Sequence, residues 1–383
     1  MNISHPLENS VDSSTAFSVD GQAASPRGLY TRIYENEVPP FADMALQRLY
    51  GNLFSSLAYG RVYGSIEQVS TYVVHDGDSI VDVWLYRHEG RQVRVLNEGI
   101  LIDRNAVLRF ANQLFASYPA VQVISFHAVQ IQRWQSWQLP MPSQRYNCLE
   151  DMVLTLPGSA PAYLAGLGKS TRSYIQRYLN KLKRDFPDFC FQVVDAQRID
   201  PQQLLQIIEL NRSRMQGKGK VSINDDQNAQ CIIRLARAYG FVGIISIDGR
   251  ICAGTINYRI GSNYFLDVLA HDSAYNDYRV GTLCCYLTIS ECIARGGREY
   301  HFLWGQDEYK SRLGGVQRDL DHLVLYRSRV QMLLNFGTVL TNLFHARERK
   351  ARLWMRSMRR GSPEASAWKR TLVWVVQSLR GLW

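Results

Sequence analysis

The sequence predicts an α/β (α+β) fold with two similar halves, each a mixed, mainly antiparallel sheet flanked by helices, followed by a basic helical tail. Three observations support this prediction. The 383 residues are 46% hydrophobic, which is enough to bury a sizeable core in two or more domains. Apolar runs of strand length are separated by glycine-containing turns, which is typical of hairpins. One order of strands, turns and helix also occurs twice, which indicates two copies of a single unit.

The second copy shows this order most clearly. The runs FVGIISI and ICAGTINYRI, joined by Asp248-Gly249, predict a β-hairpin. The run NYFLDVLA predicts a third strand, which begins after the turn at Gly261-Ser262. The polar loop HDSAYNDYRV then leads to a helix that begins at Gly281, has apolar or small residues at helical spacing, and ends at Gly296-Gly297. The run REYHFLW predicts a fourth strand.

The first copy has the same order without obvious identity. The runs VSTYVVH, SIVDVWLYR and RQVRVLN predict three strands, with turns at Asp76-Gly77-Asp78 and Glu89-Gly90. An amphipathic helix from about Asp103 to Ser117 and the run VQVISFHAV complete the copy. This copy lacks the long polar loop and the glycine before its helix, so we expect the active site in the second copy.

These patterns predict four segments. We expect a disordered leader at residues 1–40 and a degenerate first domain at residues 41–150. A catalytic domain is expected at residues 151–330, and a basic, Trp-rich helical tail at residues 331–383.

Composition argues against several classes of protein. Seven cysteines without a CxxC pair predict reduced thiols in a cytosolic protein, with neither a disulfide framework nor a metal site. The N-terminus has no basic region followed by an apolar stretch, so we expect no secretory signal. The longest apolar runs fall short of the roughly 20 residues that a membrane-spanning helix requires. The HExxH and GxSxG motifs of metalloproteases and serine hydrolases are absent from the sequence.

The tail carries most of the excess charge. Residues 341–383 hold ten Lys or Arg against two acids, and therefore eight of the ten net positive charges of the chain, together with four of its eight tryptophans. This mixture suits the headgroup region of an anionic membrane. The alternative is a helical tail that docks on its own domain and leaves its basic face in water. Nucleic acid is disfavoured, because no motif of a nucleic-acid-binding module accompanies the charge.

A helix that begins at a glycine after a strand presents unpaired backbone N–H groups, which suit a diphosphate. Arg279, two residues before Gly281, would add a charge-assisted contact. Here the sequence resembles the GNAT acyltransferase fold, in which a pattern R/Q-x-x-G-x-G/A binds the diphosphate of coenzyme A. The corresponding stretch runs from Tyr278 to Leu283 and keeps the central glycine, while its outer positions depart from the pattern.

The second half also resembles the CelD/BcsL group of GNAT proteins, acetyltransferases associated with cellulose and other exopolysaccharides. Three features carry this resemblance, which covers about residues 150–330. They are the basic helix GKSTRSYIQRYLNKLKRDFP, the tyrosine-rich loop AYNDYRVGTL, and the stretch WGQDEYK after the fourth strand. The tandem arrangement is similar to that of Fem-type peptidyltransferases, which join two GNAT-like halves.

The resemblance implies a set of site residues and no metal. The implied catalytic residues are Asp307, Glu308, Tyr309 and Lys310. The implied cofactor-binding residues are Leu269, Ala270, Arg279, Val280, Gly281 and Thr282. The implied substrate-binding residues are Arg172, Arg177, Tyr275 and Trp304.

Each catalytic residue would have a separate role in acyl transfer. Asp307 or Glu308 would act as the base or orient the acceptor, Tyr309 would protonate the leaving sulfur, and Lys310 would hold an anionic acceptor or a coenzyme A phosphate. Local sequence alone instead favours a helix N-terminus with Asp307 near its cap and Lys310 in water. The cations of the basic helix likewise predict either a solvated face or a positive rim that attracts phosphates.

Three functions stay open from the sequence. The first is transfer of an acyl group, with acetyl preferred, from acyl coenzyme A to a hydroxyl or amine of a sugar, polysaccharide or lipid-linked precursor. This enzyme would be cytoplasmic and peripheral at the inner face of the membrane. The second is Fem-like aminoacyl transfer from charged tRNA. The third is a non-catalytic GNAT-fold binding module, to which the irregular diphosphate loop points.

Overall fold

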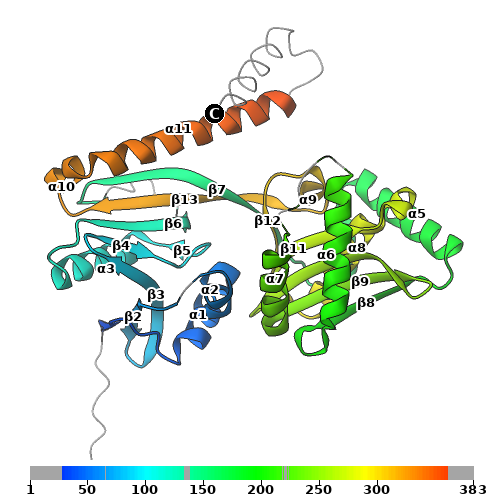
Figure 1. The fold of residues 1–383 in the computed structure, drawn as a ribbon, viewed down its shortest axis with the longest axis horizontal. Helices are drawn as coiled ribbons and strands as arrows, with labels where there is room; N and C mark the ends of the chain where they lie inside the picture. The colour runs from blue at the N-terminus through cyan, green and yellow to red at the C-terminus, as the bar shows by residue number, and fades with distance from the viewer. Residues whose placement is uncertain are drawn as a thin grey trace, which may run out of the picture.

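The computed structural model describes residues 28–360, apart from residues 65, 133–138, 218, 220, 221 and 223. Its main feature is one large mixed sheet with helices on both faces (Figure 1). The strand order is β1-β2-β3-β4-β6-β13-β7-β12-β11-β10-β9-β8, with the short β5 paired to β6. The fold class predicted from the sequence is therefore confirmed.

The first half contains the first six strands and the helices that cover them. The strands are β1 (Leu29–Tyr34), β2 (Val69–Asp76), β3 (Ser79–Glu89), β4 (Gln92–Val95), β5 (Leu101–Ile102) and β6 (Val123–Ile131). The helices are α1 (Ala42–Tyr50), the 3-10 turn η1 (Leu53–Ser55), α2 (Leu57–Tyr63) and α3 (Arg104–Ser117). The strands and the helix predicted for the first copy are all present.

The second half begins in a long strand and contains most of the helices. Its strands are β7 (Ser143–Thr155), β8 (Cys190–Asp195), β9 (Gly240–Ile247), β10 (Arg250–Ile260), β11 (Asn263–His271), β12 (Glu299–Trp304) and β13 (Val316–Tyr326). Its helices up to β12 are α4 (Ala160–Gly166), α5 (Lys169–Asp185), η2 (Ala196–Arg198), α6 (Pro201–Gln216), α7 (Asp226–Tyr239), η3 (Ser273–Tyr278) and α8 (Val280–Ala294). The later helices are α9 (Glu308–Arg312), α10 (Arg329–Leu334) and α11 (Phe336–Arg360).

The two halves share strands. β13 is the last strand of the second half in sequence, yet it pairs antiparallel with β6 of the first half as well as with β7. β7 pairs in turn with β12, so it joins the two parts of the sheet. The predicted domain boundary after residue 150 falls inside β7. Sequence periodicity shows that β13 is a strand, but it does not reveal which half that strand joins.

Two helical layers enclose the sheet of the second half. α8 packs on one face, where its apolar residues join a core with α5 and the strands, as Leu283 and Ile175 do. α6 and α7 pack on the other face, where Leu204 and Ile232 share a second core with Leu53 of η1. The first-half segment η1 therefore reaches the α6 and α7 side of the second half.

The strands β11 and β12 diverge from each other. They are parallel and pair only from Asn263 with Glu299 to Phe265 with His301, although β11 continues to His271. A β-bulge in β11 adds to the divergence, because Ile256 and Asn257 of β10 oppose Val268 and Leu266 and leave Asp267 as the extra residue. The sheet is consequently split beside the N-terminus of α8.

Three differences from the sequence predictions concern the ends and one loop. β1 lies within the predicted leader and pairs with β2, so that prediction extended too far; its mostly exposed residues give little strand signal. The predicted polar loop before α8 folds as the 3-10 turn η3. The tail is helical through residue 360, and residues 361–383 lie outside the described part. Within the described residues, no helix is long and apolar enough to cross a bilayer.

Candidate active site

A cavity of about 660 Å³ lies at the split between β11 and β12. It is lined by the end of β11, the start of α8, the end of β12 and α9 from the second half, and by η1 and α2 from the first half. Seven of the site residues implied by the sequence line it. These are Leu269, Gly281, Thr282, Trp304, Asp307, Tyr309 and Lys310.

The N-terminus of α8 opens into this cavity. Arg279 precedes the helix with a left-handed φ of +55° and provides no side-chain cap. Its carbonyl accepts a hydrogen bond from Leu283, which leaves the amides of the first turn, including those of Gly281 and Thr282, outside the helical pattern. A Cβ at position 281 would lie 2.6 Å from Nδ1 of His271, so only glycine fits against this ring.

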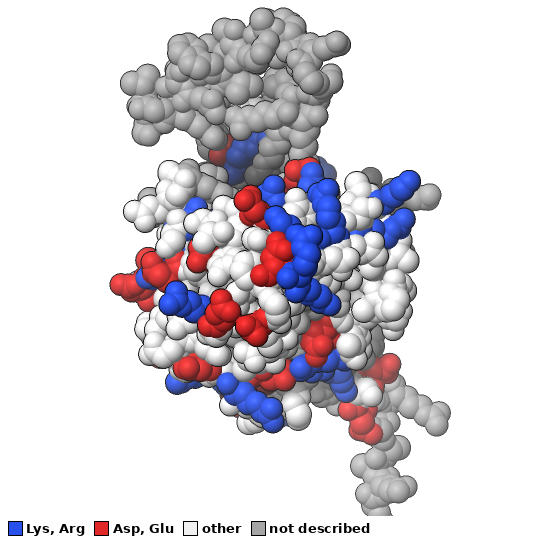
Figure 2. All heavy atoms as spheres, turned by 90° about the vertical axis from the view of Figure 1, so that its right-hand side faces the viewer, with Lys and Arg blue, Asp and Glu red and all other residues white. Residues whose placement is uncertain are grey.

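The helix α5 lies beside the start of α8. Burial raises the pKa of Tyr174 and a hydrogen bond with Thr282 opposes this effect, while a hydrogen bond with Arg279 lowers the pKa of Tyr178. The guanidinium of Arg177 stacks on the Tyr178 ring at 4.8 Å from its centroid. Arg177 and Arg279 therefore place positive charge next to the free amides of α8. Figure 2 shows a run of Lys and Arg on the face where α5 lies.

Lys310 holds the end of β12 in place. Its side chain is only 5% exposed, and its ammonium donates hydrogen bonds to the carbonyls of Leu303, at 3.2 Å, and Trp304. The carboxylate of Asp307 lies 3.9 Å away. Burial lowers the pKa of Lys310, and Asp307 opposes that effect. The expectation that local sequence leaves Lys310 in water was wrong, because the Lys310 side chain reaches back to the carbonyls at the end of β12 and is buried there.

The other residues of α9 differ in exposure. Tyr309 is half-buried in the cavity and packs edge-on against Phe302. Burial raises the pKa of Tyr309 far above its ordinary value, so its hydroxyl is protonated at neutral pH. Asp307 occupies the N-cap position without making a side-chain cap, at the mouth of the cavity. Glu308 is exposed and pairs with Arg312 at 2.6 Å, outside the cavity lining.

The sequence did not single out Asp267. It is the bulge residue of β11, and its side chain faces the cavity, where Oδ2 accepts a hydrogen bond from Tyr258 at 2.7 Å. The residue is exposed on the side of the cavity, desolvation by the protein around its carboxylate raises its pKa, and the hydrogen bond from Tyr258 opposes this effect. A bulge has no local sequence signature here, since the run NYFLDVLA reads as a regular strand.

The sequence also did not single out the polar wall supplied by α6. Asn211 and Arg214 each donate to the carbonyl of Leu269 at 3.3 Å. Nε of Arg214 is buried and has no hydrogen-bond partner among the described residues. Amide contacts continue from Asn211 to Asn224 and then to Asn228, along the same wall. The spacing of Asn224 and Asn228, four residues apart, was a usable signal of a polar wall. However, Asn224 precedes α7 and Asn228 lies in its first turn, so both look like helix-capping residues.

The first half contributes an aromatic wall. Phe54 of η1 packs against Trp304 with ring centroids 4.8 Å apart, and Tyr59 and Tyr63 of α2 line the same cavity. Since these residues lie more than 200 positions before β12, no local pattern associates them with the site.

Several implied residues lie outside the cavity lining. Arg172 donates to the carbonyls of Ala165 and Leu167, which ties α4 to α5. Tyr275 packs on Phe186 at the far end of α5. The implied residues outside the lining are Arg172, Arg177, Tyr275, Ala270, Arg279, Val280 and Glu308. Across the described residues, no group of three His, Cys, Asp or Glu side chains could hold a metal ion.

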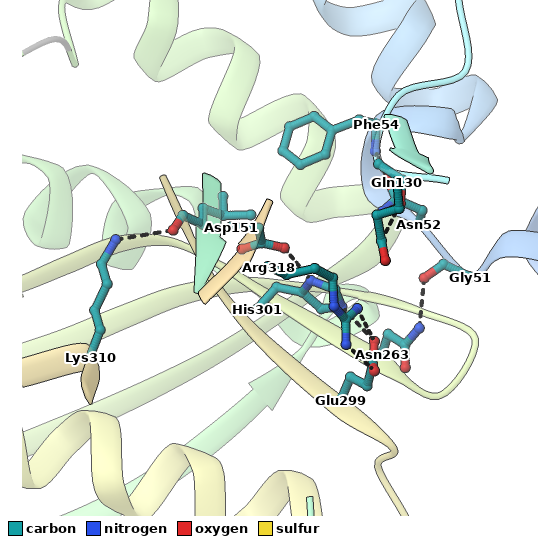
Figure 3. Close-up of polar contacts among 12 residues, drawn as sticks. Gly51, Asn52, Phe54, Gln130, Asp151, Asn263, Glu299, His301, Lys310 and Arg318 are labelled. Atoms are coloured by element: carbon teal, nitrogen blue, oxygen red, sulfur yellow. Dashed lines mark hydrogen bonds and ion pairs between the residues drawn. The ribbon is translucent and has the colours of Figure 1, made fainter. Parts of the chain in front are cut away.

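A buried ionic network supports β12 behind the cavity (Figure 3). Nδ1 of His301 lies 2.6 Å from Asp151 of β7, and Nε2 lies 3.3 Å from Glu299. Arg318 of β13 donates to both oxygens of Glu299, at 2.7 and 3.1 Å. Burial lowers the pKa of His301, but the hydrogen bonds to the two carboxylates outweigh it, so the pKa lies above its ordinary value. The network joins β7, β12 and β13 where the sheet splits.

Comparisons with known proteins identify a family for part of the chain and structures with a similar fold. Residues 169–311 match the family model described as an acetyltransferase (GNAT) domain. The chain is similar to the solved structure of FemX, with a TM-score of 0.56 and 10% identity over 80% of this chain and 99% of that one. The structure of L-PGS from Bacillus licheniformis aligns with a TM-score of 0.46 and 14% identity over 82% of this chain and 98% of that one. No curated protein matches the sequence.

Proposed function

Because residues 169–311 form a GNAT acyltransferase domain, we propose that the protein transfers an acyl group from acyl coenzyme A to a hydroxyl or amine of a saccharide. One observation carries the proposal: the free amides of α8, the carboxylate of Asp267 and the hydroxyl of Tyr309 all face one cavity at a split sheet. Acyl transfer requires these three functions, namely anion binding, a base and an acid.

The residues around the start of α8 fit a diphosphate. The ring of His271 packs directly against Gly281, and the amides of Gly281 and Thr282 are donors at the positive end of a 15-residue helix. Arg279 and Arg177 would neutralise the phosphate charge from the side of α5. The thioester end would then extend along β11 into the split, where β11 no longer pairs with β12.

Asp267 and Tyr309 would move the two protons of the reaction. Asp267 takes the proton of the acceptor O–H or N–H, and the raised pKa makes its carboxylate a stronger base. The acceptor atom forms a bond to the acyl carbon, the carbon–sulfur bond breaks, and Tyr309 gives its proton to the departing sulfur. The unpaired Nε of Arg214 would donate to the developing oxyanion. In this assignment Asp267 takes the role of base that the sequence resemblance implied for Asp307 or Glu308, and Asp307 orients Lys310.

The opposite walls of the cavity suit a sugar acceptor. Phe54, Tyr59 and Trp304 offer aromatic surfaces for the apolar faces of a pyranose ring. Asn224 and Asn228 offer amide donors and acceptors for its hydroxyls on the other side. This pairing, together with the CelD/BcsL resemblance, supports a saccharide of the cell envelope or an exopolysaccharide as acceptor, free or lipid-linked.

The proposal is tested by measuring thiol release from acetyl coenzyme A in the presence of hydroxyl and amino sugars, with product masses by mass spectrometry. We expect sugar-dependent release by the full chain and a loss of about 10²-fold or more in Asp267→Asn. Asp188→Asn, an exposed substitution of the same kind on the loop after α5, is the control and should retain activity.

Two other outcomes would contradict the proposal. Transfer from charged tRNA that coenzyme A does not inhibit would indicate the Fem-like reaction. Calorimetry that detects no binding of acetyl, succinyl or longer acyl coenzyme A would indicate a binding module.

A further inference from the structure

The helices α10 and α11 carry an unusual concentration of exposed apolar side chains. Among the described residues, fifteen large apolar side chains are exposed, and eight of them lie on these two helices. We name these eight residues the outer face. They are Val330, Leu333, Leu334, Phe336, Leu340, Leu343, Phe344 and Trp354. Leu333 is 73% exposed and Phe344 is 65% exposed, so the outer face is in contact with solvent.

The outer face follows one side of α11. Its residues at 336, 340, 343, 344 and 354 recur at intervals of three and four or their multiples, which places them on one stripe of a helix. α11 lies along β7 and β13 at the top of the view in Figure 1. The stripe faces away from these strands, because residues on the opposite side of α11 contact them.

The opposite side of α11 is fixed to the sheet by polar contacts. Asn342 donates to Gln144 of β7 at 3.0 Å, and Arg349 donates to Asn147 at 3.0 Å and forms a buried ion pair with Glu150. Turning the outer face inward would break this pair and leave a buried charge without compensation. The helix is therefore oriented with its apolar stripe outward.

Positive charge accompanies the outer face on the same two helices. Four exposed cations lie on the described part of the two helices: Arg329, Arg347, Lys350 and Arg352. Arg347 falls within the apolar stripe, and Lys350 follows about one helical turn later at the edge of the stripe. The single acid of this stretch, Glu348, lies 3.6 Å from Arg352. The face is thus apolar and cationic together, which disfavours contact with a second copy of the same charge.

We infer that the outer face of α10 and α11 docks on an anionic lipid surface, with its apolar side chains between the headgroups and its cations on lipid phosphates. An amphipathic helix with aromatic and basic residues lies in the plane of such an interface. Long cationic side chains extend to the headgroups while their stems stay with the apolar surface. The inference does not depend on the proposed function, since it concerns a surface away from the cavity lining.

Vesicle co-sedimentation of the full chain tests this inference. We expect binding to vesicles of phosphatidylcholine with phosphatidylglycerol, weaker binding to phosphatidylcholine alone, and loss of binding at high salt. The double variant L340E/F344E should lower the bound fraction about tenfold or more. The matched control M44E/L101E changes two exposed apolar residues of the first half and should bind as the unchanged protein does.

Urea unfolding shows whether L340E/F344E is folded, and an unchanged midpoint is expected because both side chains are exposed. Unaltered vesicle binding by this variant would overturn the inference. A dimer seen by light scattering without lipid, and abolished by the same substitutions, would overturn it in favour of a second copy. Vesicle binding by W368S/W374S but not by the unchanged chain would overturn the inference in another way, because it would indicate that residues 361–383 and not lipid occupy the outer face.

Discussion

The buried ammonium of Lys310 donates a hydrogen bond to the carbonyl of Leu303 at 3.2 Å, and Leu303 has a φ of +57°. A left-handed conformation is rare for a leucine and costs free energy. The hydrogen bond from the Lys310 ammonium to the carbonyl of the same leucine compensates part of that cost. The end of β12, and with it Trp304 in the cavity, thus depends on a lysine six residues further along the chain, on α9.

Lys310→Met should therefore destabilise the fold as well as impair transfer. The carbonyls of Leu303 and Trp304 would lose their donor inside the protein, which costs about 1–3 kcal/mol. Urea unfolding followed by circular dichroism measures this loss. Lys183→Met, on the exposed face of α5, is the control and should change the free energy of unfolding by less than about 0.5 kcal/mol. Equal stability of the two variants would show that Lys310 does not hold the strand end.

Tyr309→Phe should leave the fold intact and slow transfer. Burial raises the pKa of Tyr309, so the hydroxyl stays protonated as a proton donor must. Loss of a general acid lowers kcat by about 10²–10⁴-fold. Thiol release from acetyl coenzyme A measures kcat, with Tyr30→Phe on the exposed strand β1 as control. A variant with the full kcat would remove Tyr309 from the reaction.

Gly281→Ala should weaken coenzyme A binding through His271. The new methyl group would lie 2.6 Å from Nδ1 of the ring, so the ring or the start of α8 must shift. Calorimetric titration of coenzyme A should show a Kd raised by about tenfold or more. The double variant G281A/H271A provides space for the methyl group and should recover part of the affinity. If the single and double variants bind equally, the ring is not the cause.

His301 should make the stability depend on pH. In the folded protein its pKa is raised above the ordinary 6.5. Its contribution to the free energy of unfolding is therefore fully present below about pH 6.5, and it is lost as the pH rises through the pKa of the folded protein. His301→Gln should thus cost about 1.5–3 kcal/mol at pH 6 and less at pH 9. Urea unfolding at both values measures this difference. His88→Gln, at the exposed turn beside Gly90, is the control, and an equal cost of His301→Gln at both pH values would contradict a charged His301.

Local patterns predicted the elements of this fold well. The hairpin of β9 and β10 follows from alternating apolar residues around Asp248-Gly249, and the limits of α8 follow from Gly281 and Gly296. The placement of β13 between β6 and β7 was not predictable in this way. Strand pairing depends on tertiary contacts between residues some 180 positions apart, such as Leu323 and Arg145, which leave no periodic signal.

Only those parts of the site that neighbouring residues form could be predicted from the sequence. The stretch from Trp304 to Lys310 and the glycine of α8 lie on adjacent elements, and the structure places them in one cavity. Asp267 was missed because it is the extra residue of a β-bulge, and the sequence around it has the pattern of a regular strand. Phe54 and Arg214 were missed because they come from elements that the fold, and not the sequence order, places against β11 and β12.

The strand exchange has a practical consequence for dissecting this enzyme. A fragment that ends near residue 150 would keep β6 but lack β13, and would expose the unpaired backbone of a long, apolar strand. Such edges pair with other chains, so isolated halves are expected to aggregate and not to fold as modules. Loss of either half is therefore expected to destabilise the other, so the two halves form a single folding unit.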